Sequence, residues 1–451
     1  MSEVLFQKRD QENIEWYPCN FRKITQNEIW GKSSVTTQKG LGLYIHIPFC
    51  MFMCPFCHFN RYLWSQEQER IYVDALKKEI RLYSFLPLLN KSKITAIYFG
   101  GGTPTALTTN TLVDILRYIR EKFSISKNAE ITVEAHPLTI DRDKLSGLLE
   151  NGVNRISIGI QSLTEKFLKI LGTPHDVQRG VRAIELAKDS GFQNISIDLI
   201  YSIPTEGIDD WERDLELALK YETAHIACYP LAVVPRTTLY KNIKKGKLPN
   251  KPDEATEIEM FKHARNTLEM HGYEQYTIFN FAKKNKKCLY IRIAQEAPQG
   301  EYLGLGAGAF EYVNDFFSCK EPSLEHYVKI LKKDIIPYLA GVYMSTEEKM
   351  ARYMILGIKC LKVSKEEFKK KFGVEIREVY GNVIEELKKW DLVTENTSTI
   401  SLTEKGMVYI SNIAKMFYTN ENRGLSQPIE MNLQRCLEEI LHNQKYRGVN
   451  S

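Results

Sequence analysis

Short runs of β-branched and other apolar residues recur through the first half of the chain, and a stretch with helical periodicity follows each run. The runs start about 25 to 50 residues apart, which leaves room for one crossover helix between successive strands. The expected strands are 43–48, 94–99, 130–135, 155–160, 194–200 and 225–234. This alternation predicts an α/β fold in which parallel strands form a partial (β/α)6 barrel.

The stretches between these strands carry apolar residues three and four positions apart, as amphipathic helices do. They are residues 67–83, 109–123, 176–190 and 209–219. In a parallel barrel the helices cover the outside, and the loops after the carboxyl ends of the strands carry the chemistry. We therefore expect functional side chains at those strand ends.

From about Glu347 the pattern changes to helices and a short hairpin. Helices are expected at 365–372 and 376–388, and strands at 392–395 and 399–402. This pattern predicts a small C-terminal winged-helix-like α+β domain. Fold alone does not confer function, and none of these helices is rich in arginine, so we expect no nucleic-acid partner.

The chain divides into four expected parts. These are an N-terminal extension (1–40), the barrel (41–320), a C-terminal domain (321–425) and a polar tail (426–451). The net charge of +5 is spread along the chain, and the content of 26% charged and 43% hydrophobic residues is ordinary for a globular enzyme. The sequence has no apolar run long enough to span a membrane and no secretory signal, so we expect a cytoplasmic protein.

Three cysteines, Cys50, Cys54 and Cys57, fall within eight residues directly after the first expected strand. Thiolates are the usual ligands of a [4Fe–4S] cluster, and three of them would leave one iron free for a small molecule. A zinc site is the main alternative, but its fourth ligand would have to be His46 or His58, and no second cysteine or histidine pair completes the usual pattern. Buried structural thiols are a further alternative. The spacing favours the cluster.

Polar and glycine-rich segments follow the next strands. The segment 99–105 reads Phe-Gly-Gly-Gly-Thr-Pro-Thr, and glycines let the backbone approach a ligand closely, although a tight turn alone would also account for them. Glu134 ends the third strand, Gln161 and Ser162 end the fourth, and Asp198 lies in the fifth. Such groups converge on one rim of a parallel barrel, where they can bind an amine, hydroxyls or a carboxylate.

The order of these motifs resembles the radical S-adenosylmethionine (SAM) superfamily and, within it, the HemN-like branch. The matching motifs are Cys-x3-Cys-x2-Cys, Gly-Gly-Gly-Thr-Pro-Thr, Ser-Ile-Gly-Ile-Gln-Ser and Ile-Asp-Leu-Ile-Tyr, and the similarity runs from about Tyr44 to Ile410. The resemblance implies a [4Fe–4S] cluster that cleaves SAM reductively to a 5′-deoxyadenosyl radical. It also implies an anaerobic setting, a small-molecule substrate and an electron donor such as a flavodoxin or ferredoxin.

The resemblance also assigns residues by motif position, and it implies two SAM molecules. Cys50, Cys54 and Cys57 would act in catalysis as the ligands of the cluster. The SAM amine would lie against the glycine turn, and a second SAM would lie against the loop 304–310. The positions carried over for cofactor binding are Tyr44, Phe56, Gly101, Gly102, Thr103, Glu134, Gln161, Asp198 and Phe310.

Three departures from the branch bear on the reaction. Coproporphyrinogen oxidases carry a further cysteine where this chain has Phe59, and family members commonly have an arginine where it has Thr173. Heme chaperones of the branch have a His-Asn-x-x-Tyr-Trp segment, whereas the interval 286–298 here contains no histidine. We therefore expect a class C methyltransferase that uses a second SAM to form a C–C bond on an sp² carbon of an aromatic, heterocyclic or other unsaturated substrate. The alternatives are a tetrapyrrole enzyme (coproporphyrinogen III dehydrogenase or anaerobic heme-degrading methyltransferase) and a heme-binding chaperone without catalysis.

Overall fold

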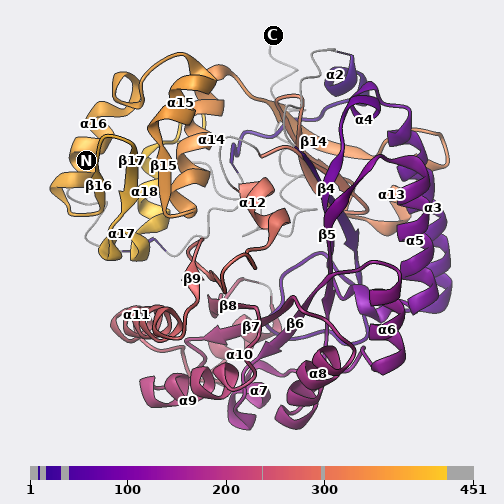
Figure 1. Cartoon of the computed structure of the whole chain (residues 1–451), viewed down its shortest axis with the longest axis horizontal. Coiled ribbons are helices and arrows are strands. Elements are labelled where there is room, and N and C mark those ends of the chain that lie inside the picture. Colours follow the sequence, from indigo (N-terminus) through magenta and orange to yellow (C-terminus); the bar gives the residue numbers. More distant parts are fainter. Residues whose placement is uncertain (1–8, 11–16, 32–39, 236, 296–299, 424–451) are drawn as a thin grey trace.

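The computed structural model of the chain describes residues 9–10, 17–31, 40–235, 237–295 and 300–423, and its centre is a row of six parallel strands. All six expected strands are confirmed, in the order β1-β4-β5-β6-β7-β8. Figure 1 labels β4 to β8 of this row. Their bounds are β1 Leu41–Ile47, β4 Ile94–Gly101, β5 Ile125–Ala135, β6 Arg155–Gln161, β7 Ile195–Tyr201 and β8 His225–Pro230. The row curves into a partial barrel.

Aliphatic residues make these strands fit together. Ile45, Ile97, Val133, Ile158 and Ile197 are buried in successive strands. Branched side chains pack well on a pleated surface, and strands covered on both faces are apolar along most of their length. The apolar runs of the sequence therefore become the centre of the sheet.

Helices cover the outside of the barrel (Figure 1). The four expected helices are confirmed, and several start at a side-chain cap. Ser65 accepts a hydrogen bond from Gln68 N, and Asp176 accepts one from Arg179 N. The outer helices are α3 Gln66–Ser84, α5 Thr109–Lys122, α6 Arg142–Glu150, α7 Glu165–Leu171, α8 Val177–Asp189, α9 Ile208–Leu219 and α11 Glu254–Met270. Sequence periodicity did not predict α6 and α7, which have nine and seven residues and so show the pattern weakly, and it also missed the 17-residue helix α11.

Further strands extend the row at both edges, so the barrel does not close on itself. On one side β11 lies parallel to β1, and β12, β13 and β14 follow in antiparallel pairs. On the other side β10 pairs with β8, and β9 pairs with β10. The bounds are β9 Glu274–Gln275, β10 Asn280–Ala282, β11 Tyr302–Leu305, β12 Phe310–Val313, β13 Phe316–Lys320 and β14 Tyr338–Tyr343. Strand β14 thus lies beyond the domain boundary expected at residue 320, and the division into domains stays a prediction.

A short helix, α12 (Leu289–Gln295), lies in the middle of the barrel (Figure 1). It packs against β1 and β4. The ring of Tyr290 lies 5.9 Å from the ring of Tyr44 and 5.0 Å from the ring of Tyr98. The histidine-free interval of the sequence therefore contributes to the filling of the barrel.

The C-terminal domain combines helices with a three-stranded antiparallel sheet of order β15-β17-β16. The expected helices and hairpin are confirmed. The bounds are α14 Thr346–Lys359, β15 Lys362–Ser364, α15 Lys365–Phe372, α16 Ile376–Lys389, β16 Val393–Glu395 and β17 Thr399–Leu402.

The N-terminal extension was expected to have no clear element, but its described part contains helix α2 (Gln26–Trp30). Tyr17 and Ile29 are buried, and Arg22 forms a β-bridge with Gly341 of β14. These contacts bury Tyr17 and connect the described part of the extension to β14, which the sequence alone did not predict. The polar tail expected at 426–451 lies outside the described residues.

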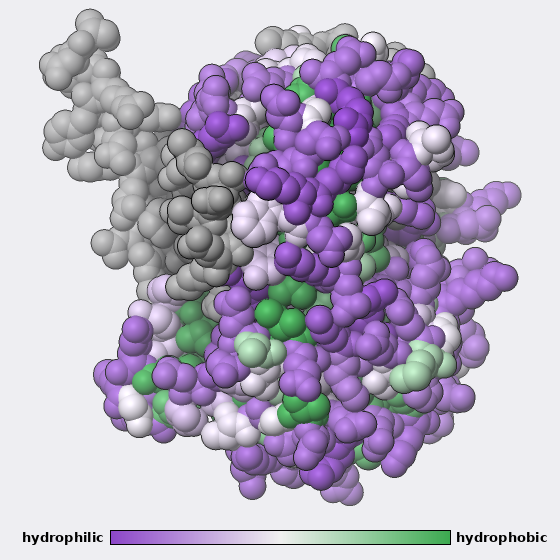
Figure 2. Space-filling view, turned by 90° about the vertical axis from the view of Figure 1, so that its left-hand side faces the viewer, coloured by the Kyte–Doolittle hydropathy of each residue, from purple (hydrophilic) through white to green (hydrophobic). Residues whose placement is uncertain are grey.

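Much of the surface is polar. In the described residues, none of the helices combines the length and the apolar character that crossing a membrane requires. The face in Figure 2 is mainly hydrophilic, and its hydrophobic side chains form small separate patches.

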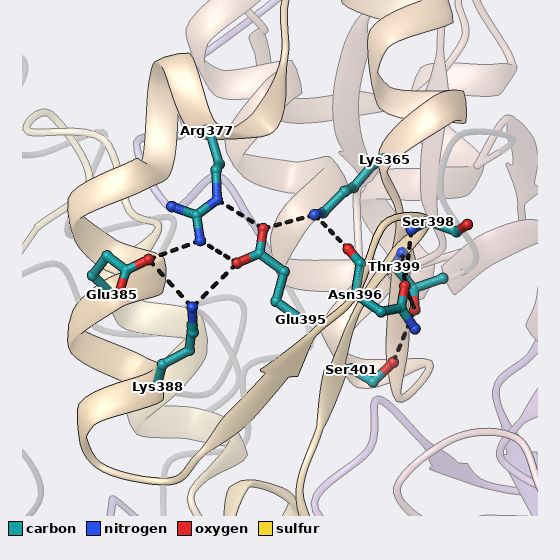
Figure 3. A network of polar contacts seen from close by, with 9 residues as sticks. All are labelled: Lys365, Arg377, Glu385, Lys388, Glu395, Asn396, Ser398, Thr399 and Ser401. Carbon is teal, nitrogen blue, oxygen red and sulfur yellow. Dashed lines mark hydrogen bonds and ion pairs between the residues drawn. The ribbon is translucent and has the colours of Figure 1, made fainter.

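A network of ion pairs links α15, α16 and β16 in the C-terminal domain (Figure 3). The Glu395 carboxylate accepts hydrogen bonds from Arg377 Nε at 2.8 Å and from Arg377 Nη2, and it pairs with Lys365 Nζ at 2.7 Å. Lys388 lies 3.6 Å from the same carboxylate. Hydrogen bonds from Arg377 and the pairing with Lys365 lower the pKa of Glu395 to about 2. One carboxylate thus joins two helices to the hairpin.

Candidate cofactor site

The carboxyl ends of the parallel strands surround an open hollow with a volume of about 890 Å³, counting the part open to solvent. The structure brings most of the residues singled out from the sequence to its lining. These are Cys50, Cys54, Phe56, Cys57, Gly101, Gly102, Thr103, Glu134, Gln161 and Asp198.

The cysteine loop is held by one arginine that sequence reasoning missed. Arg61 Nη2 donates hydrogen bonds to the carbonyl oxygens of Cys54 and Cys57, each at 2.8 Å. The Cys57 N–H also donates to the Cys54 carbonyl at 3.2 Å, which closes a turn between the two cysteines. Arg61 therefore fixes the curvature of the loop and lines the hollow as well. A single arginine after a cysteine motif gives no periodic signal that would have revealed this role.

Two further contacts anchor the loop to the barrel. The Pro55 carbonyl accepts a hydrogen bond at 3.0 Å from the N–H of Leu239, which lies in helix α10 (Thr238–Lys244). The Phe56 side chain packs against an apolar cluster that includes Phe167 and Leu239. The loop is thus supported on both sides.

The three thiols share one rim but do not form a single-ion site. Among the described residues, no group of three or more His, Cys, Asp or Glu side chains is placed to hold one metal ion. Zinc needs four ligands within about 2.0 to 2.3 Å of the ion, whereas each thiolate of an iron–sulfur cluster binds a different iron and the sulfur atoms stand further apart. The arrangement therefore fits a cluster better than zinc. Burial raises the pKa of all three thiols, and that of Cys54 to about 11, so a bound cation is needed to hold them as thiolates.

The glycine turn packs directly on the cysteine loop. The Gly102 N–H donates to the Ile47 carbonyl at 2.8 Å, and the Thr103 N–H donates to the Phe49 carbonyl at 2.7 Å. A Cβ at Gly102 would come within 2.8 Å of Phe49 O, and Gly101 has a φ of +109° and lies against the His46 ring. The N–H groups of this turn are therefore used inside the protein, so the turn can offer a ligand carbonyl oxygens rather than N–H donors.

Two partly buried carboxylates line the hollow. Glu134 accepts hydrogen bonds from Tyr98 OH at 2.7 Å and from Gly101 N at 3.2 Å. Burial raises the pKa of Glu134, and burial followed by the nearby Glu134 charge raises the pKa of Asp198 to about 7. A cationic ligand would lower both pKa values and gain from both charges.

Gln161 ends β6 in a strained conformation. Its φ is +68°, in the left-handed region that costs a residue with a side chain about 1 to 2 kcal/mol. Gly159 makes room for it, because a Cβ there would lie 2.7 Å from Gln161 Nε2. The adjacent Ser162 instead donates to the Asp214 carboxylate at 2.5 Å, away from the hollow. Of the two residues noted at this strand end, Gln161 faces the ligand site.

Two predicted cofactor residues are not in the lining of the hollow. Tyr44 donates from its hydroxyl to His46 Nδ1 at 3.3 Å, below the glycine turn. Phe310 belongs to a separate apolar cluster, where its ring lies 5.7 Å from the ring of Phe317. Thr173, at the position of the family arginine, donates its hydroxyl at 3.3 Å to the His175 carbonyl of its own loop. These side chains serve packing and loop structure in the described chain.

A pair of histidines next to the hollow was also missed. The Leu138 N–H donates to His136 Nδ1 at 3.2 Å, so the proton lies on His136 Nε2, which donates to His175 Nδ1 at 3.3 Å. His175 Nε2 in turn donates to the Ile160 carbonyl at 3.1 Å. Burial lowers both pKa values, that of His136 to about 3, so both rings are neutral. The chain of hydrogen bonds braces the wall of the hollow.

Comparison with known proteins agrees with this geometry. Residues 44–218 match the radical SAM superfamily, and residues 344–409 match the HemN C-terminal domain. The chain is 32% identical over 365 residues to the heme chaperone HemW of Bacillus subtilis (80% of this chain, 95% of the relative) and 29% identical over 385 residues to that of Lactococcus lactis (85% and 99%). The structure of coproporphyrinogen III oxidase (HemN) from Escherichia coli is similar in fold, with a TM-score of 0.75, 23% identity and coverage of 86% and 92%.

The barrel, the cysteine loop and these matches define the class of protein: the chain belongs to the radical SAM superfamily. This family implies a [4Fe–4S] cluster and SAM as cofactors. The C-terminal domain and the relatives that match along nearly their whole length narrow the assignment further. Within the superfamily the chain is a member of the HemN-like branch.

Proposed function

We propose that this chain binds a [4Fe–4S] cluster and SAM in the hollow and that it carries heme as a chaperone. The observation that carries the proposal is the match to the heme chaperone HemW of Bacillus subtilis, at 32% identity along 95% of that protein. A match of this length includes both the barrel and the C-terminal domain. The heme chaperone was an alternative interpretation of the sequence, and the relatives favour it over methyl transfer.

Cys50, Cys54 and Cys57 are the residues that would hold the cluster. When bound, the cluster supplies one iron that is free to bind SAM and electrons for its reductive cleavage. Arg61 would keep the loop in the shape that the three thiolates need. Its guanidinium would also supply positive charge toward the SAM carboxylate, which Thr173 does not provide.

The remaining lining residues fit the charges of SAM. Its sulfonium and ammonium groups are positive, and Glu134 and Asp198 offer two carboxylates in a partly buried setting. The carbonyl oxygens of Gly101 and Gly102 would accept hydrogen bonds from the ammonium group, since the N–H groups of the turn are engaged. The Gln161 side-chain amide would accept or donate a hydrogen bond to SAM at the same rim. Its strained backbone supports a role in binding.

Methyl transfer with a second SAM is the competing hypothesis. The departures at Phe59, Thr173 and the interval 286–298 supported it in the sequence, but the relatives named above do not. The second SAM would need the loop 304–310, where Phe310 packs against Phe21 and Phe317. The arrangement of that loop gives methyl transfer no further support.

A parallel experiment separates the two functions. The protein is reconstituted with its cluster without oxygen and divided. One part is titrated with heme and followed by absorption, and the other receives methyl-labelled SAM, dithionite and unsaturated candidate acceptors. We expect saturable heme binding and no label in any acceptor. Absence of heme binding, under conditions in which the Bacillus subtilis relative binds heme, would contradict the proposal, and labelled product would favour methyl transfer.

A further inference from the structure

The proposed function leaves the position of heme on this chain unexplained. The interval 286–298 has no histidine, and its helix α12 lies inside the barrel, where the Tyr290 ring is stacked on that of Tyr44 and tilted against that of Tyr98. The hollow itself is assigned to the cluster and SAM. A flat macrocycle would therefore need an apolar surface outside the part of the hollow that the cluster and SAM would occupy.

In the described part of the chain, exposed apolar side chains concentrate on the cysteine loop and the residues that follow it. Five of the twelve large hydrophobic side chains that are strongly exposed come from residues 51–63 of the cysteine loop. We name these five the cluster-loop platform. They are Met51 (39% exposed), Phe52 (45%), Met53 (49%), Phe59 (53%) and Leu63 (59%). Apolar side chains gathered in this way on a monomer mark an interaction site rather than ordinary surface.

The platform is continuous with the cofactor site. Met51, Phe52 and Phe59 also line the hollow, so an occupant of the platform would lie at its mouth. The Phe59 ring lies 4.7 Å from the ring of His58, and the Phe52 ring lies 6.4 Å from the ring of His136. Aromatic rings that are anchored on one side can stack on a second flat π-system on the other.

The platform also carries ligands for iron. A methionine thioether is an established axial ligand of heme, and methionine adapts its shape to an apolar partner. Arg61 Nη1 donates to Met53 Sδ at 3.2 Å, which engages that sulfur, whereas Met51 lies at the mouth of the hollow. The two aromatic rings of Phe52 and Phe59 and a thioether suit a metalloporphyrin better than a protein partner, because a protein interface would also need polar contacts.

We propose that the cluster-loop platform binds the face of heme and that the Met51 thioether ligates its iron. The inference rests on the proposed function and gives it a binding site. It explains how a chain without the histidine segment of the heme chaperones can hold the same cargo. It also places heme next to the cofactor hollow, so occupation of the hollow would affect binding of heme.

The test uses the full chain with its cluster and compares Met51→Leu with Met270→Leu. Leucine keeps the apolar volume but removes the sulfur, and Met270 is 77% exposed on α11, outside the platform. We expect Met51→Leu to bind heme at least about tenfold more weakly and to lose the spectrum of thioether-ligated iron. Met270→Leu should match the unchanged protein. Unchanged affinity and spectrum in Met51→Leu would overturn the inference.

Two further measurements keep the result interpretable if Met51→Leu loses its cluster. Metal-free protoporphyrin has no iron to ligate, so Met51→Leu should bind it as the unchanged protein does. The double variant Phe59→Ser, Leu63→Ser should bind metal-free protoporphyrin more weakly. If it binds protoporphyrin as tightly as the unchanged protein does, the platform is not the binding surface. His58→Ala should retain the heme spectrum of the unchanged protein. If His58→Ala loses this spectrum and Met51→Leu keeps it, the iron ligand is His58 and not Met51.

The outcomes also separate this inference from the proposed function. If the unchanged protein binds no heme, the proposed function fails and the inference fails with it. If it binds heme and all platform variants bind equally, the inference alone fails. Binding of a protein electron donor that is abolished by the platform variants, with heme binding intact, would assign the surface to that partner instead.

Discussion

Arg61 and the three cysteines show what a sequence reveals about single residues. The triplet was predictable because few kinds of site place three cysteines at this spacing, and Glu134 and Asp198 were predictable because parallel strands end on one rim. Arg61 and His136 were not, since their roles depend on the path of a loop and on one hydrogen-bond chain. The sequence therefore predicted which side chains converge on the hollow wherever their positions follow from the order of the strands, and their roles in binding stay predictions.

Replacement of Arg61 tests its role in holding the cysteine loop. Arg61→Met keeps the side-chain length but removes the donors to the carbonyls of Cys54 and Cys57. Hydrogen bonds from a charged donor contribute about 1.5 to 3 kcal/mol, so we expect the cluster to be lost to a chelator roughly tenfold faster. The loss is followed by absorption. Arg182→Met, which changes an exposed ion pair on α8, is the control, and equal rates would contradict the assignment.

The pKa of Asp198 gives a prediction for SAM binding. Burial, followed by the nearby Glu134 charge, raises this pKa to about 7, so the carboxylate is only partly ionised at neutral pH. We expect SAM affinity, measured by calorimetry, to rise as the pH increases from about 6 to about 8, because the ionised form accepts hydrogen bonds from the ligand and attracts its positive charge. The Asp198→Asn variant should bind SAM more weakly, and its affinity should no longer show this rise with pH. An unchanged profile in Asp198→Asn would contradict the role.

The same shift has an opposite consequence for the protein without SAM. An unfolded aspartate has a pKa of about 3.9, so between about pH 4 and 7 the folded state holds a proton that the unfolded state has lost. The contribution of Asp198 to stability is therefore full below about pH 4 and is lost as the pH rises through 7. The buried Glu79 and the partly buried Glu301, each with a pKa of about 7, share this dependence of stability on pH, so Asp198→Asn should reduce it only in part.

At the scale of elements, periodicity predicted the six strands of the row and the helices α3, α5, α8 and α9, but not α6, α7, α11 or α12. The long helices of the barrel have an apolar face against the sheet, which leaves a repeated pattern. Helix α12 instead lies inside the barrel and contacts its surroundings with Tyr290 and its neighbours, so no one-sided apolar stripe develops. Its position depends on the whole barrel and could not be derived locally.

Tyr290 is the residue through which α12 contacts the site. The hydroxyl of Tyr98, whose ring lies 5.0 Å from the ring of Tyr290, donates to Glu134 at 2.7 Å. We expect Tyr290→Ala to lower the free energy of unfolding by about 1 to 3 kcal/mol, since it removes several ring contacts, and to weaken SAM binding through Tyr98 and Glu134. Urea denaturation and calorimetry measure the two effects. Phe85→Ala, at a ring that is 69% exposed, is the control, and a loss no larger than the control's would contradict the packing role.

The ion-pair network of the C-terminal domain predicts an acid-dependent stability (Figure 3). The pKa of Glu395 is about 2 in the folded state, lowered first by the hydrogen bonds from Arg377, against a usual value of about 4.3 when unfolded. Its stabilisation is therefore present above about pH 4.3 and is lost as the pH falls toward 2. We expect Glu395→Gln to lower the free energy of unfolding by about 1 to 2 kcal/mol at neutral pH and by less in acid.

The control for this prediction is Glu185→Gln, which changes the exposed pair with Arg182 and should alter stability by less than about 0.5 kcal/mol. Both variants are unfolded by urea at several pH values. We expect the free energies of unfolding of Glu395→Gln and the unchanged protein to converge in acid. If their difference stays constant down to about pH 2, the proposed role of the network is contradicted.

At the scale of the whole molecule, the N-terminal extension links parts that are distant in sequence. Arg22 bridges to Gly341, and the Cys19 N–H donates to the Asn422 side chain at 2.6 Å. The order of strands along the barrel could be predicted from the alternating pattern, but the addition of β11 to β14 beside β1 could not. Those strands are short and return to the first strand from about 260 residues later in the chain, a pairing that local patterns do not encode.

Function, too, is better judged from the whole molecule. The expectation of methyl transfer relied on a few positions at which the sequence departs from its branch. The absence of a histidine in 286–298 favoured methyl transfer, whereas the relatives that match along nearly their whole length are heme chaperones. A missing ligand excludes one way of holding heme rather than heme itself, because another side chain can ligate the iron. The cluster-loop platform offers such a side chain.

Carriage of heme by this chain is tested most directly by a transfer assay. The protein with its cluster is loaded with one equivalent of heme without oxygen, separated from free heme, and mixed with an apo-heme protein whose holo spectrum is distinct. We expect stoichiometric loading and transfer of heme to the acceptor with a rate that depends on SAM. Failure to retain heme through the separation, while the cluster and SAM remain bound, would contradict a role as a heme chaperone.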